Sequence, residues 1–394
     1  MSALPMAITP DTPPVEGLDQ ARVRRMNTAV VLRALAASDD EVTLAALGRA
    51  TGLSRRTLQA ILGELSDAGW ADESESISGG AGRPAKSYRY VADHRVAVAL
   101  RLDTHSAYAM IVDLRGHVLG RAQASLGADY FEPDRALEHL RRVTERARED
   151  ASLPSDILAA GTIAAGGVID ARAGVVTRLI NAPAWTGYPL ARSATARLGF
   201  AVTADNDANL AAYAESRAGA ATGRNDIAWL VHGNRTGAGF VLRGGIHHGH
   251  GGAAGELVES RVLGLQQSAG DGFALLSSPI AAERVPALEL AVAARRGDET
   301  ARAAARDFAA EIADLIDVLA WTIAPEVVVL GGGLEDAADV LIPSITDRLR
   351  DRGDPAIGIV PTALGADAVL AGAAHVALDA VSASVLETIV RGDA

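Results

Sequence analysis

The chain contains no cysteine among its 394 residues. This absence excludes disulfide bonds, catalytic thiols and thiolate zinc sites, so a metal would need His and carboxylate ligands. No uninterrupted apolar run reaches the roughly 18 residues of a membrane span. The first twenty residues hold four prolines and lack the basic-then-apolar order of a signal peptide. We therefore expect a cytoplasmic protein with no membrane partner.

Basic residues are outnumbered, 37 Lys and Arg against 49 Asp and Glu, for a formal net charge of -12. This balance excludes a protein that coats nucleic acid or an anionic membrane over its whole surface, but it allows a local basic patch. The deficit is uneven: residues 1–95 carry 11 basic and 12 acidic residues, and residues 96–394 carry 26 and 37. With 49% hydrophobic residues, the chain predicts a large folded core and an appended module.

The appended module is predicted at residues 21–92, after a flexible arm at residues 1–20. Apolar residues recur at helical spacings over 23–35, and Thr43 and Ser54 are placed to cap two short helices separated by a break at Gly52. Alternating Tyr88 and Tyr90 then indicate a β-hairpin with its tip at residues 79–84. Helix, helix-turn-helix and hairpin is the order of a winged helix.

The second helix of such a unit enters the major groove of DNA by its N-terminal residues, where Arg reads guanine and Gln reads adenine. No acidic residue lies between Val42 and Gly63. A basic face used for binding a protein is the alternative. The residues predicted to contact double-stranded DNA are Arg49, Ser54, Arg55, Arg56, Thr57 and Gln59 from the helices and Arg83 and Lys86, with Arg89, from the hairpin.

Residues 93–394 are expected to form two similar α/β halves. The first has strands at 96–102, 107–112 and 117–122, a helix at 133–147 and a strand before Gly166, while the second has strands at 227–232, 237–242 and 327–330. In each half, antiparallel strands are followed by helical sequence and then by a further strand. This duplication predicts two lobes that face one cleft.

A carboxylate and an amide meet at Asn206 and Asp207, at a predicted helix start after an apolar strand. Together they can accept from and donate to neighbouring sugar hydroxyls, although a residue at this position is often only a helix cap. The glycine-rich segment that ends at Gly255 and Glu256 allows close backbone approach and adds a second carboxylate. The two segments favour recognition of hydroxyl groups.

With these residues the chain resembles the ROK family of bacterial sugar kinases and sugar-responsive transcriptional regulators. The resemblance covers nearly all of residues 20–390 and includes residues 206–209, Asn181 with Trp185 and Gly187, residues 331–333 and the Gly82-Arg83-Pro84 tip of the hairpin. It implies a two-lobed actin-like ATPase (ribonuclease H-like) fold after the winged helix. The sugar site that we expect consists of Gly167, Asn181, Asn206, Asp207, Glu256 and Glu259.

Departures from the family pattern indicate that kinase activity is lost. The family's Asp-x-Gly-Gly-Thr phosphate loop is replaced by residues 103–106 without glycine, and its Gly-Thr-Gly loop by residues 233–235, so Asp207, the position of the general base, would be vestigial. The histidine of the family's zinc site is matched by Glu259, and residues 267–278 hold neither its cysteines nor a glutamate. Glu259 either accepts a sugar hydroxyl or is a surface residue.

We expect no metal and no cofactor, although His247, His248 and His250 are possible metal ligands. The sequence predicts a transcriptional regulator of carbohydrate genes, a repressor, which binds a DNA operator as a homodimer or dimer of dimers and responds to a small sugar effector. The alternatives are an ATP-dependent sugar kinase that binds DNA, and a regulator that senses a protein instead of a sugar.

Overall fold

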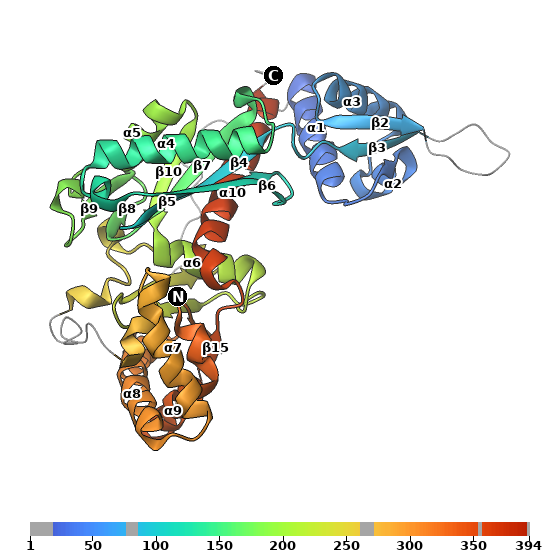
Figure 1. Cartoon of the computed structure of the whole chain (residues 1–394). Helices are drawn as coiled ribbons and strands as arrows, with labels where there is room; N and C mark the ends of the chain where they lie inside the picture. The colour runs from blue at the N-terminus through green and yellow to red at the C-terminus, as the bar shows by residue number, and fades with distance from the viewer. Residues whose placement is uncertain (1–18, 76–85, 261–271, 354–356, 392–394) are drawn as a thin grey trace, which may run out of the picture. The chain divides into compact units, whose positions relative to one another are not determined.

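The computed structural model describes residues 19–75, 86–260, 272–353 and 357–391. These residues form two compact units (Figure 1). One contains the described residues up to His94 together with those from Ser382 onward, and the other is Arg95–Val381. Each unit is described by itself below.

Up to His94, the described residues of the first unit form three helices and a small antiparallel sheet. Its elements are α1 (Gln20–Ala36), β1 (Val42–Thr43), α2 (Leu44–Thr51), α3 (Arg55–Asp67), β2 (Ala71–Glu75) and β3 (Lys86–Tyr90), and the strand order is β1-β3-β2. Thr43 and Ser54 cap α2 and α3 as predicted, because their hydroxyls accept from the amides of Ala46 and Thr57. Gly52 ends α2 in the left-handed region, with a φ of 71°. This order of elements is typical of a winged helix. The predicted hairpin tip lies outside the described residues.

In the described part of the second unit there are two five-stranded sheets of the same plan. In the first, β4, β5 and β6 are antiparallel neighbours, β7 is parallel to β4 and β10 is parallel to β7. In the second, β12 is antiparallel to β11 and to β13, while β14 and β15 continue in parallel from β11. The predicted duplicated α/β layout is confirmed, and it is the two-sheet arrangement of actin-like ATPases.

The elements of the first half are β4 (Val96–Leu102), β5 (Ser106–Asp113), β6 (Val118–Ser125), α4 (Pro133–Asp150), β7 (Leu158–Ala165), β8 (Val168–Asp170), β9 (Val175–Arg178), α5 (Leu190–Leu198), β10 (Ala201–Asn206) and α6 (Asp207–Ala218). Those of the second half are β11 (Ile227–Val231), β12 (Gly237–Leu242), β13 (Gly245–Ile246), α7 (Ala281–Arg295), α8 (Glu299–Thr322), β14 (Val327–Leu330), α9 (Ala338–Asp351), β15 (Gly358–Pro361) and α10 (Ala368–Arg391). Helix α4 continues beyond the predicted end at residue 147, since Arg148 on its next turn pairs with Glu145.

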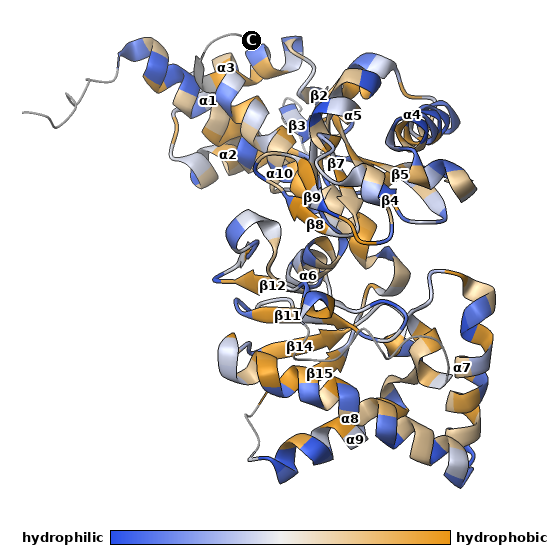
Figure 2. Ribbon diagram, turned by 90° about the vertical axis from the view of Figure 1, so that its left-hand side faces the viewer, coloured by the Kyte–Doolittle hydropathy of each residue, from blue (hydrophilic) through white to orange (hydrophobic). Residues whose placement is uncertain are grey.

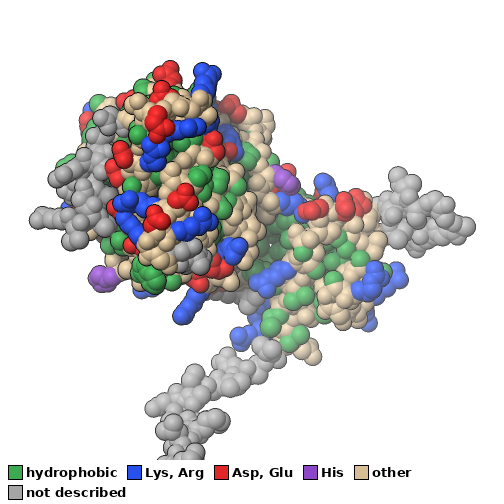
Figure 3. All heavy atoms as spheres, turned by 90° about the horizontal axis from the view of Figure 1, so that it is seen from below, with side chains coloured by type: hydrophobic (Ala, Val, Ile, Leu, Met, Phe, Trp, Pro, Cys, Tyr) green, Lys and Arg blue, Asp and Glu red, His purple; other side chains and the backbone are tan. Residues whose placement is uncertain are grey.

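Each half has its own apolar core between its sheet and the covering helices. Leu100, Ile111 and Leu140 are buried in the first, and Leu230, Ile316 and Leu330 in the second. Figure 2 shows the apolar residues concentrated along β11, β12, β14 and β15, with polar residues on the outer sides of α8 and α9. On the face of the second unit seen in Figure 3, basic and acidic side chains alternate, consistent with ion pairs such as that of Arg295 with Asp339.

Most of helix α6 is buried, and it packs closely against α10. Leu210, Ala211 and Ala214 of α6 are inaccessible to solvent, and a Cβ added at Gly372 of α10 would collide with the carbonyl oxygen of Leu210. Gly365–Ile389 is long and apolar enough to cross a membrane, by length and composition alone. Within the second unit, however, Ala373 and Ala377 of α10 are fully buried, as in a core helix.

We expect Gly372→Ala to destabilise the protein, because the added methyl group has no space against the α6 backbone. Overpacking of this kind costs about 1 to 3 kcal/mol. Gly63→Ala is the matched control, since Gly63 lies inside α3 with open space around the added Cβ, and alanine is the better helix former. Denaturant unfolding followed by circular dichroism should give opposite signs for the two variants, and equal stabilities would contradict the packing argument.

Candidate functional site

A cavity of about 740 Å³ lies between the two halves of the second unit. Its lining comes from the loops that follow β4, β7, β10, β11 and β14, together with the start of α6 and part of α7. Ligands in open α/β sheets bind at the loops beyond the strand ends, so the cavity lies where the fold places a binding site.

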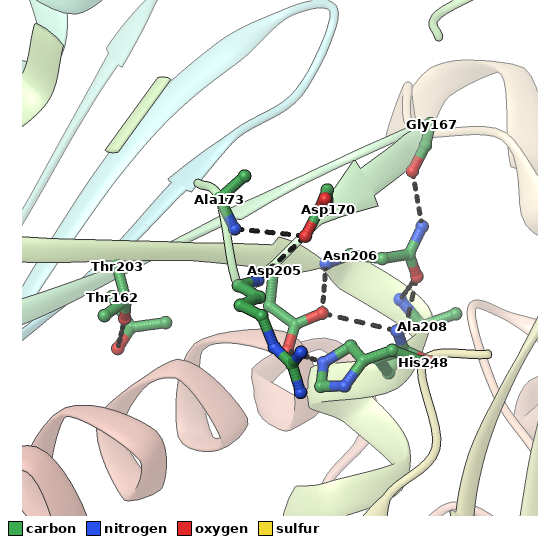
Figure 4. Close-up of polar contacts among 11 residues, drawn as sticks. Thr162, Gly167, Asp170, Ala173, Thr203, Asp205, Asn206, Ala208 and His248 are labelled. Atoms are coloured by element: carbon green, nitrogen blue, oxygen red, sulfur yellow. Dashed lines mark hydrogen bonds and ion pairs between the residues drawn. The ribbon is translucent and has the colours of Figure 1, made fainter. Parts of the chain in front are cut away.

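Asn206 is the hydrogen-bonding centre of the cavity wall. It ends β10, and its Oδ1 caps α6 by accepting from the amides of Ala208 at 2.8 Å and Asn209 at 3.2 Å. Its Nδ2 donates to the carbonyl oxygen of Gly167 at 3.0 Å and to Oε1 of Glu256 at 3.3 Å. Figure 4 shows the side chain between α6 and Gly167. The side-chain amide of Asn206 therefore joins the loops that follow β7 and β13 to the start of α6. The sequence alone indicated Asn206 only as a helix cap or a sugar ligand.

Asp205 and His248 form a second polar pair next to this junction (Figure 4). Nε2 of His248 lies 2.7 Å from Oδ2 of the buried Asp205, and this hydrogen bond raises the pKa of His248. The sequence suggested His248 as a metal ligand. Within the described ranges, no group of three or more His, Asp or Glu side chains is arranged to hold a metal ion.

Three carboxylates, of Asp207, Glu256 and Glu259, line one part of the cavity. Burial is the main cause that raises the pKa of Glu256 to about 7, and the negative charges of Asp207 and Glu259 raise it further. Glu259 forms an ion pair with Arg178 at 2.8 Å and is only 23% exposed, so it faces the cavity wall rather than open solvent. Carboxylates in this setting can accept hydrogen bonds from several hydroxyl groups of one ligand.

The six residues predicted to bind sugar all line this cavity. Their shared position is a finding of the structure, whereas sugar binding itself stays a prediction; the six are Gly167, Asn181, Asn206, Asp207, Glu256 and Glu259. Gly167 has a φ of +86°, and a Cβ there would lie 2.6 Å from the carbonyl oxygen of Arg178, so glycine is required. Trp185, which accompanied Asn181 in the resemblance, has a structural role, because it is buried and donates to the carbonyl oxygen of Tyr130.

In the loop at residues 103–106, two backbone amides donate hydrogen bonds to the side chain of the loop's first residue, Asp103. Oδ1 of Asp103 accepts from the amides of His105 at 2.9 Å and Ser106 at 2.8 Å. The same carboxylate pairs with Arg101 through Oδ2, at 3.3 Å. In a glycine-rich phosphate loop, the backbone amides donate to the phosphate. In this chain, the amides of His105 and Ser106 already donate to the side chain of Asp103.

The loop at residues 233–235 is engaged in the same way. The amide of Gly233 donates to Oγ1 of Thr236, that of Asn234 to the carbonyl oxygen of Ala274, and that of Arg235 to Oγ of Ser277, at 3.4, 3.1 and 3.1 Å. Both segments that replace phosphate loops therefore direct these amides to acceptors within the chain.

The cavity residues that sequence reasoning missed include Arg101, Arg235 and Arg284. Arg101 is the only charged residue of the otherwise apolar strand β4, and this contrast is a sequence signal that could have found it. In the sequence, Arg235 stands out only as part of an altered loop, and Arg284 lies on a helix with no distinguishing pattern. The structure brings all three to the same cavity.

The residues predicted to contact DNA belong to the first unit. Arg49, Arg55, Arg56 and Gln59 are exposed. The hydroxyl of Ser54 caps α3 by accepting from the amide of Thr57, and it also lies 2.8 Å from the hydroxyl of Thr57. The hairpin residue Lys86 pairs with Glu73, Arg89 pairs with Asp72 at 2.7 Å, and Arg83 lies outside the described residues. The exposed groups of α3 are available to a partner, and their role in DNA binding stays a prediction.

A family model described as "ROK family" matches residues 98–258 and 264–380. Among curated proteins, the DNA-binding transcriptional repressor Mlc of Escherichia coli is 23% identical over 88% of this chain and 91% of its own length. A glucokinase of Streptomyces coelicolor is 26% identical over 68% of this chain and 93% of its own length. The bifunctional enzyme NanE/NanK of Brucella suis is 34% identical over 48% of this chain, which spans only 37% of that enzyme.

Solved structures share the fold. A ROK family transcriptional regulator, described as a homolog of Escherichia coli MLC, superposes with a TM-score of 0.67 at 19% identity over 94% of this chain and 99% of its own. A ROK family glucokinase from Streptomyces griseus, in complex with glucose and AMPPNP, has a TM-score of 0.57 at 23% identity over 72% and 99%. The relatives thus include both regulators and kinases.

The raised pKa of Glu256 predicts a pH-dependent stability. Between about pH 4.5 and 7 the folded chain keeps a proton that the unfolded chain releases, so the contribution of this group to stability falls as the pH rises. Glu256→Gln keeps an oxygen for Asn206 and removes the titration. Near pH 4.5 the variant should match the parent chain, and at pH 8 it should be more stable by up to about 3 kcal/mol, measured by denaturant unfolding.

Glu299→Gln is the control of opposite sign, because a hydrogen bond from Arg306 lowers the pKa of the exposed Glu299. This variant should gain no stability at pH 8. A stability difference between Glu256→Gln and the parent chain that stays constant from pH 5 to 8 would contradict the assignment.

Proposed function

Because this chain belongs to the ROK family, which contains both sugar kinases and transcriptional regulators, we propose that it is a sequence-specific DNA-binding regulator of carbohydrate genes, a repressor, controlled by a sugar in the cavity of the second unit. In this proposal residues 21–92 form the DNA-binding winged helix and residues 93–394 the sugar-sensing ROK domain. The protein acts in the cytoplasm, and kinase activity has been lost.

The observation that carries the proposal is the state of the two altered phosphate loops. Phosphoryl transfer depends on positioning and on electrostatic stabilisation of the transferred group. The amides of His105, Ser106 and Asn234 are already bonded to acceptors within the chain, so holding a nucleotide there would require those bonds to break. The polar groups around Asn206 do not depend on these loops, which supports ligand binding without catalysis.

The exposed end of α3 supports the DNA-binding part of the proposal. Arg55, Arg56 and Gln59 are exposed on its first turns, where the recognition helix of a helix-turn-helix meets base edges. A single module makes few base contacts, so we propose a homodimer or a dimer of dimers that reads two half-sites. The sugar can then change DNA affinity only as far as it binds the two conformations of the protein differently.

A sugar kinase that also binds DNA is the second candidate. It is favoured by Asp207, which lines the cavity next to Asn206, where the family's general base stands, and by the glucokinases among the relatives. A regulator that senses a protein partner instead of a sugar is a third candidate, favoured if no sugar raises the melting temperature of the protein.

Replacing Arg55 and Arg56 together by alanine should abolish specific DNA binding. Each arginine that pairs with a guanine supplies about 1 to 3 kcal/mol, so a loss on the order of 100-fold or more is expected. Fluorescence anisotropy on a duplex selected from random DNA by the wild-type chain measures the effect. Arg142→Ala, at another exposed arginine, on α4, is the control and should bind normally. Unchanged affinity of the double variant with unaltered sedimentation would remove the hypothesis.

A coupled assay with ATP, Mg²⁺ and a panel of hexoses should detect no sugar phosphorylation that depends on Asp207. The parent chain and Asp207→Asn should therefore show the same background rate, while a ROK glucokinase serves as the active reference. The physical reason is that the loop amides are unavailable to the nucleotide phosphates. Sugar-stimulated ATP consumption that disappears in Asp207→Asn would instead establish the kinase.

A further inference from the structure

Four arginines line the cavity in addition to the predicted sugar residues, and one of them, Arg178, pairs with Glu259. The other three form the arginine group described below. Arg101 extends from β4, Arg235 from the loop between β11 and β12, and Arg284 from α7. Resting on the proposed function, we infer that Arg101, Arg235 and Arg284 bind a phosphoryl group, and that the effector is therefore a phosphorylated sugar rather than a neutral one.

Arg235 is the centre of this arginine group. Its Nε donates to the carbonyl oxygen of Ser277 at 2.7 Å, and an Nη donates to that of Gly332 at 3.5 Å. Within the described part of the chain, no carboxylate forms an ion pair with it. A guanidinium stays charged even where burial lowers its pKa, as it does here. The fold thus orients a cation in the cavity and leaves its charge without a directly paired anion.

Arg101 and Arg284 are held beside the cavity by one acidic partner each. Arg101 pairs with Asp103 and lies 5.5 Å from the centre of the Tyr108 ring, and Arg284 pairs with Asp336. In both arginines the buried Nε has no hydrogen-bond acceptor among the described residues. Besides burial, the positive charges of Arg101 and Arg284 lower the pKa of Arg235, while the carboxylates of Asp207 and Asp103 act in the opposite direction. A bound anion would offset the repulsion that Arg235 meets from the two other arginines.

The chemistry of the anion follows from the shape of these donors. A guanidinium presents paired N–H groups that match two oxygens of a phosphoryl group. Asp103 does not oppose this binding strongly, because its carboxylate is already bonded to Arg101 and to two backbone amides. Arg235 and Arg284 both lie at the turn formed by Gly332 and Gly333, which places them at the loop that follows β14.

The other part of the cavity suits the sugar of the same ligand. Asn206, Asp207 and Glu256 offer the hydrogen-bond acceptors and the amide described above, and they belong to the loops around the start of α6. A volume of about 740 Å³ accommodates a hexose phosphate. A nucleotide also carries phosphoryl groups, but the amides that would hold them are engaged, so we assign the arginines to a sugar phosphate.

Inorganic phosphate tests the arginine group without knowledge of the sugar. At constant ionic strength, phosphate should raise the melting temperature of the intact chain in a saturable way, and chloride should not. Arg235→Gln should weaken phosphate binding at least tenfold. Arg235→Lys keeps the charge but not the paired N–H groups, so its affinity for phosphate should lie between that of the parent chain and that of Arg235→Gln. Arg306→Gln, at an exposed arginine of α8, is the matched control and should bind phosphate normally. Arg284→Gln replaces Arg235→Gln if the latter fails to fold.

Isothermal titration with hexoses, their 6-phosphates and ATP then identifies the source of the phosphoryl group. We expect a hexose phosphate to bind at least tenfold more tightly than its parent sugar, and Arg235→Gln to remove that difference while the parent sugar binds as before. Equal affinity for sugar and sugar phosphate, absence of phosphate binding, or ATP as the tightest ligand would each overturn the inference and leave a sugar-responsive regulator possible. If phosphate binds through Arg235 but no sugar or sugar phosphate does, the proposed function fails and the assignment to a sugar phosphate fails with it.

Discussion

The position of α6 is the constraint on which the candidate site depends. At its first turn, Asn206 caps the helix and holds Gly167 and Glu256. At its last turn the fully buried Glu215 accepts from Thr362 and from the amides of Ala220 and Leu364. Asparagine is suited to the first position because it offers both an oxygen and an N–H group. Aspartate would keep the cap but lose the donor, and serine would not span to Glu256. A helix held by buried polar groups at both ends gives the cavity wall a defined geometry.

The two altered phosphate loops affect catalysis and ligand binding differently. Catalysis needs donors that are directed at a transferred group and are unoccupied until it arrives. In this chain Asp103 and Ser277 occupy such donors, whereas the acceptors around Asp207 still line an open cavity. A cavity of this kind can still bind a ligand, because ligand affinity depends on the contacts made in the ground state. In the proposed function, the cavity therefore binds a ligand while the amides of the altered loops stay bonded within the chain.

Much of this fold could be predicted from local pattern. Strands β4, β12 and β14 have the predicted bounds because each is a short apolar run between turn residues, and Thr43, Ser54 and Asn206 were recognisable as helix caps. Asn206, Asp207 and Glu256 could be placed at one site because the resemblance joins segments that are distant in sequence. The strands β8 and β9 and the helix α5 were missed, since they are short and carry weak periodicity.

The site was less predictable wherever its chemistry depends on contacts between distant segments. His248 could be noticed as a possible ligand, but its pairing with Asp205 depends on a loop returning 43 residues later. Arg235 and Arg284 come from different elements, and only the folded chain brings both to the turn at Gly332 and Gly333. Nothing in the spacing of arginines along a chain reveals whether a carboxylate neutralises them. That information resides in the tertiary structure.

The charge distribution reconciles an acidic chain with the proposed affinity for DNA. Residues 1–95 are nearly balanced, and the surplus of acidic residues lies in residues 96–394. Electrostatic interactions in solution are screened over about 8 Å at physiological ionic strength, so DNA responds to the charges of the surface that it touches rather than to the net charge of -12. Arg55 and Arg56 lie on a helix whose first two turns carry no acidic side chain. The surplus carboxylates belong to the second unit and do not face DNA bound at α3 in this proposal. In that unit, the acidic part of the cavity wall suits hydroxyl groups, and the arginines beside it suit an anion.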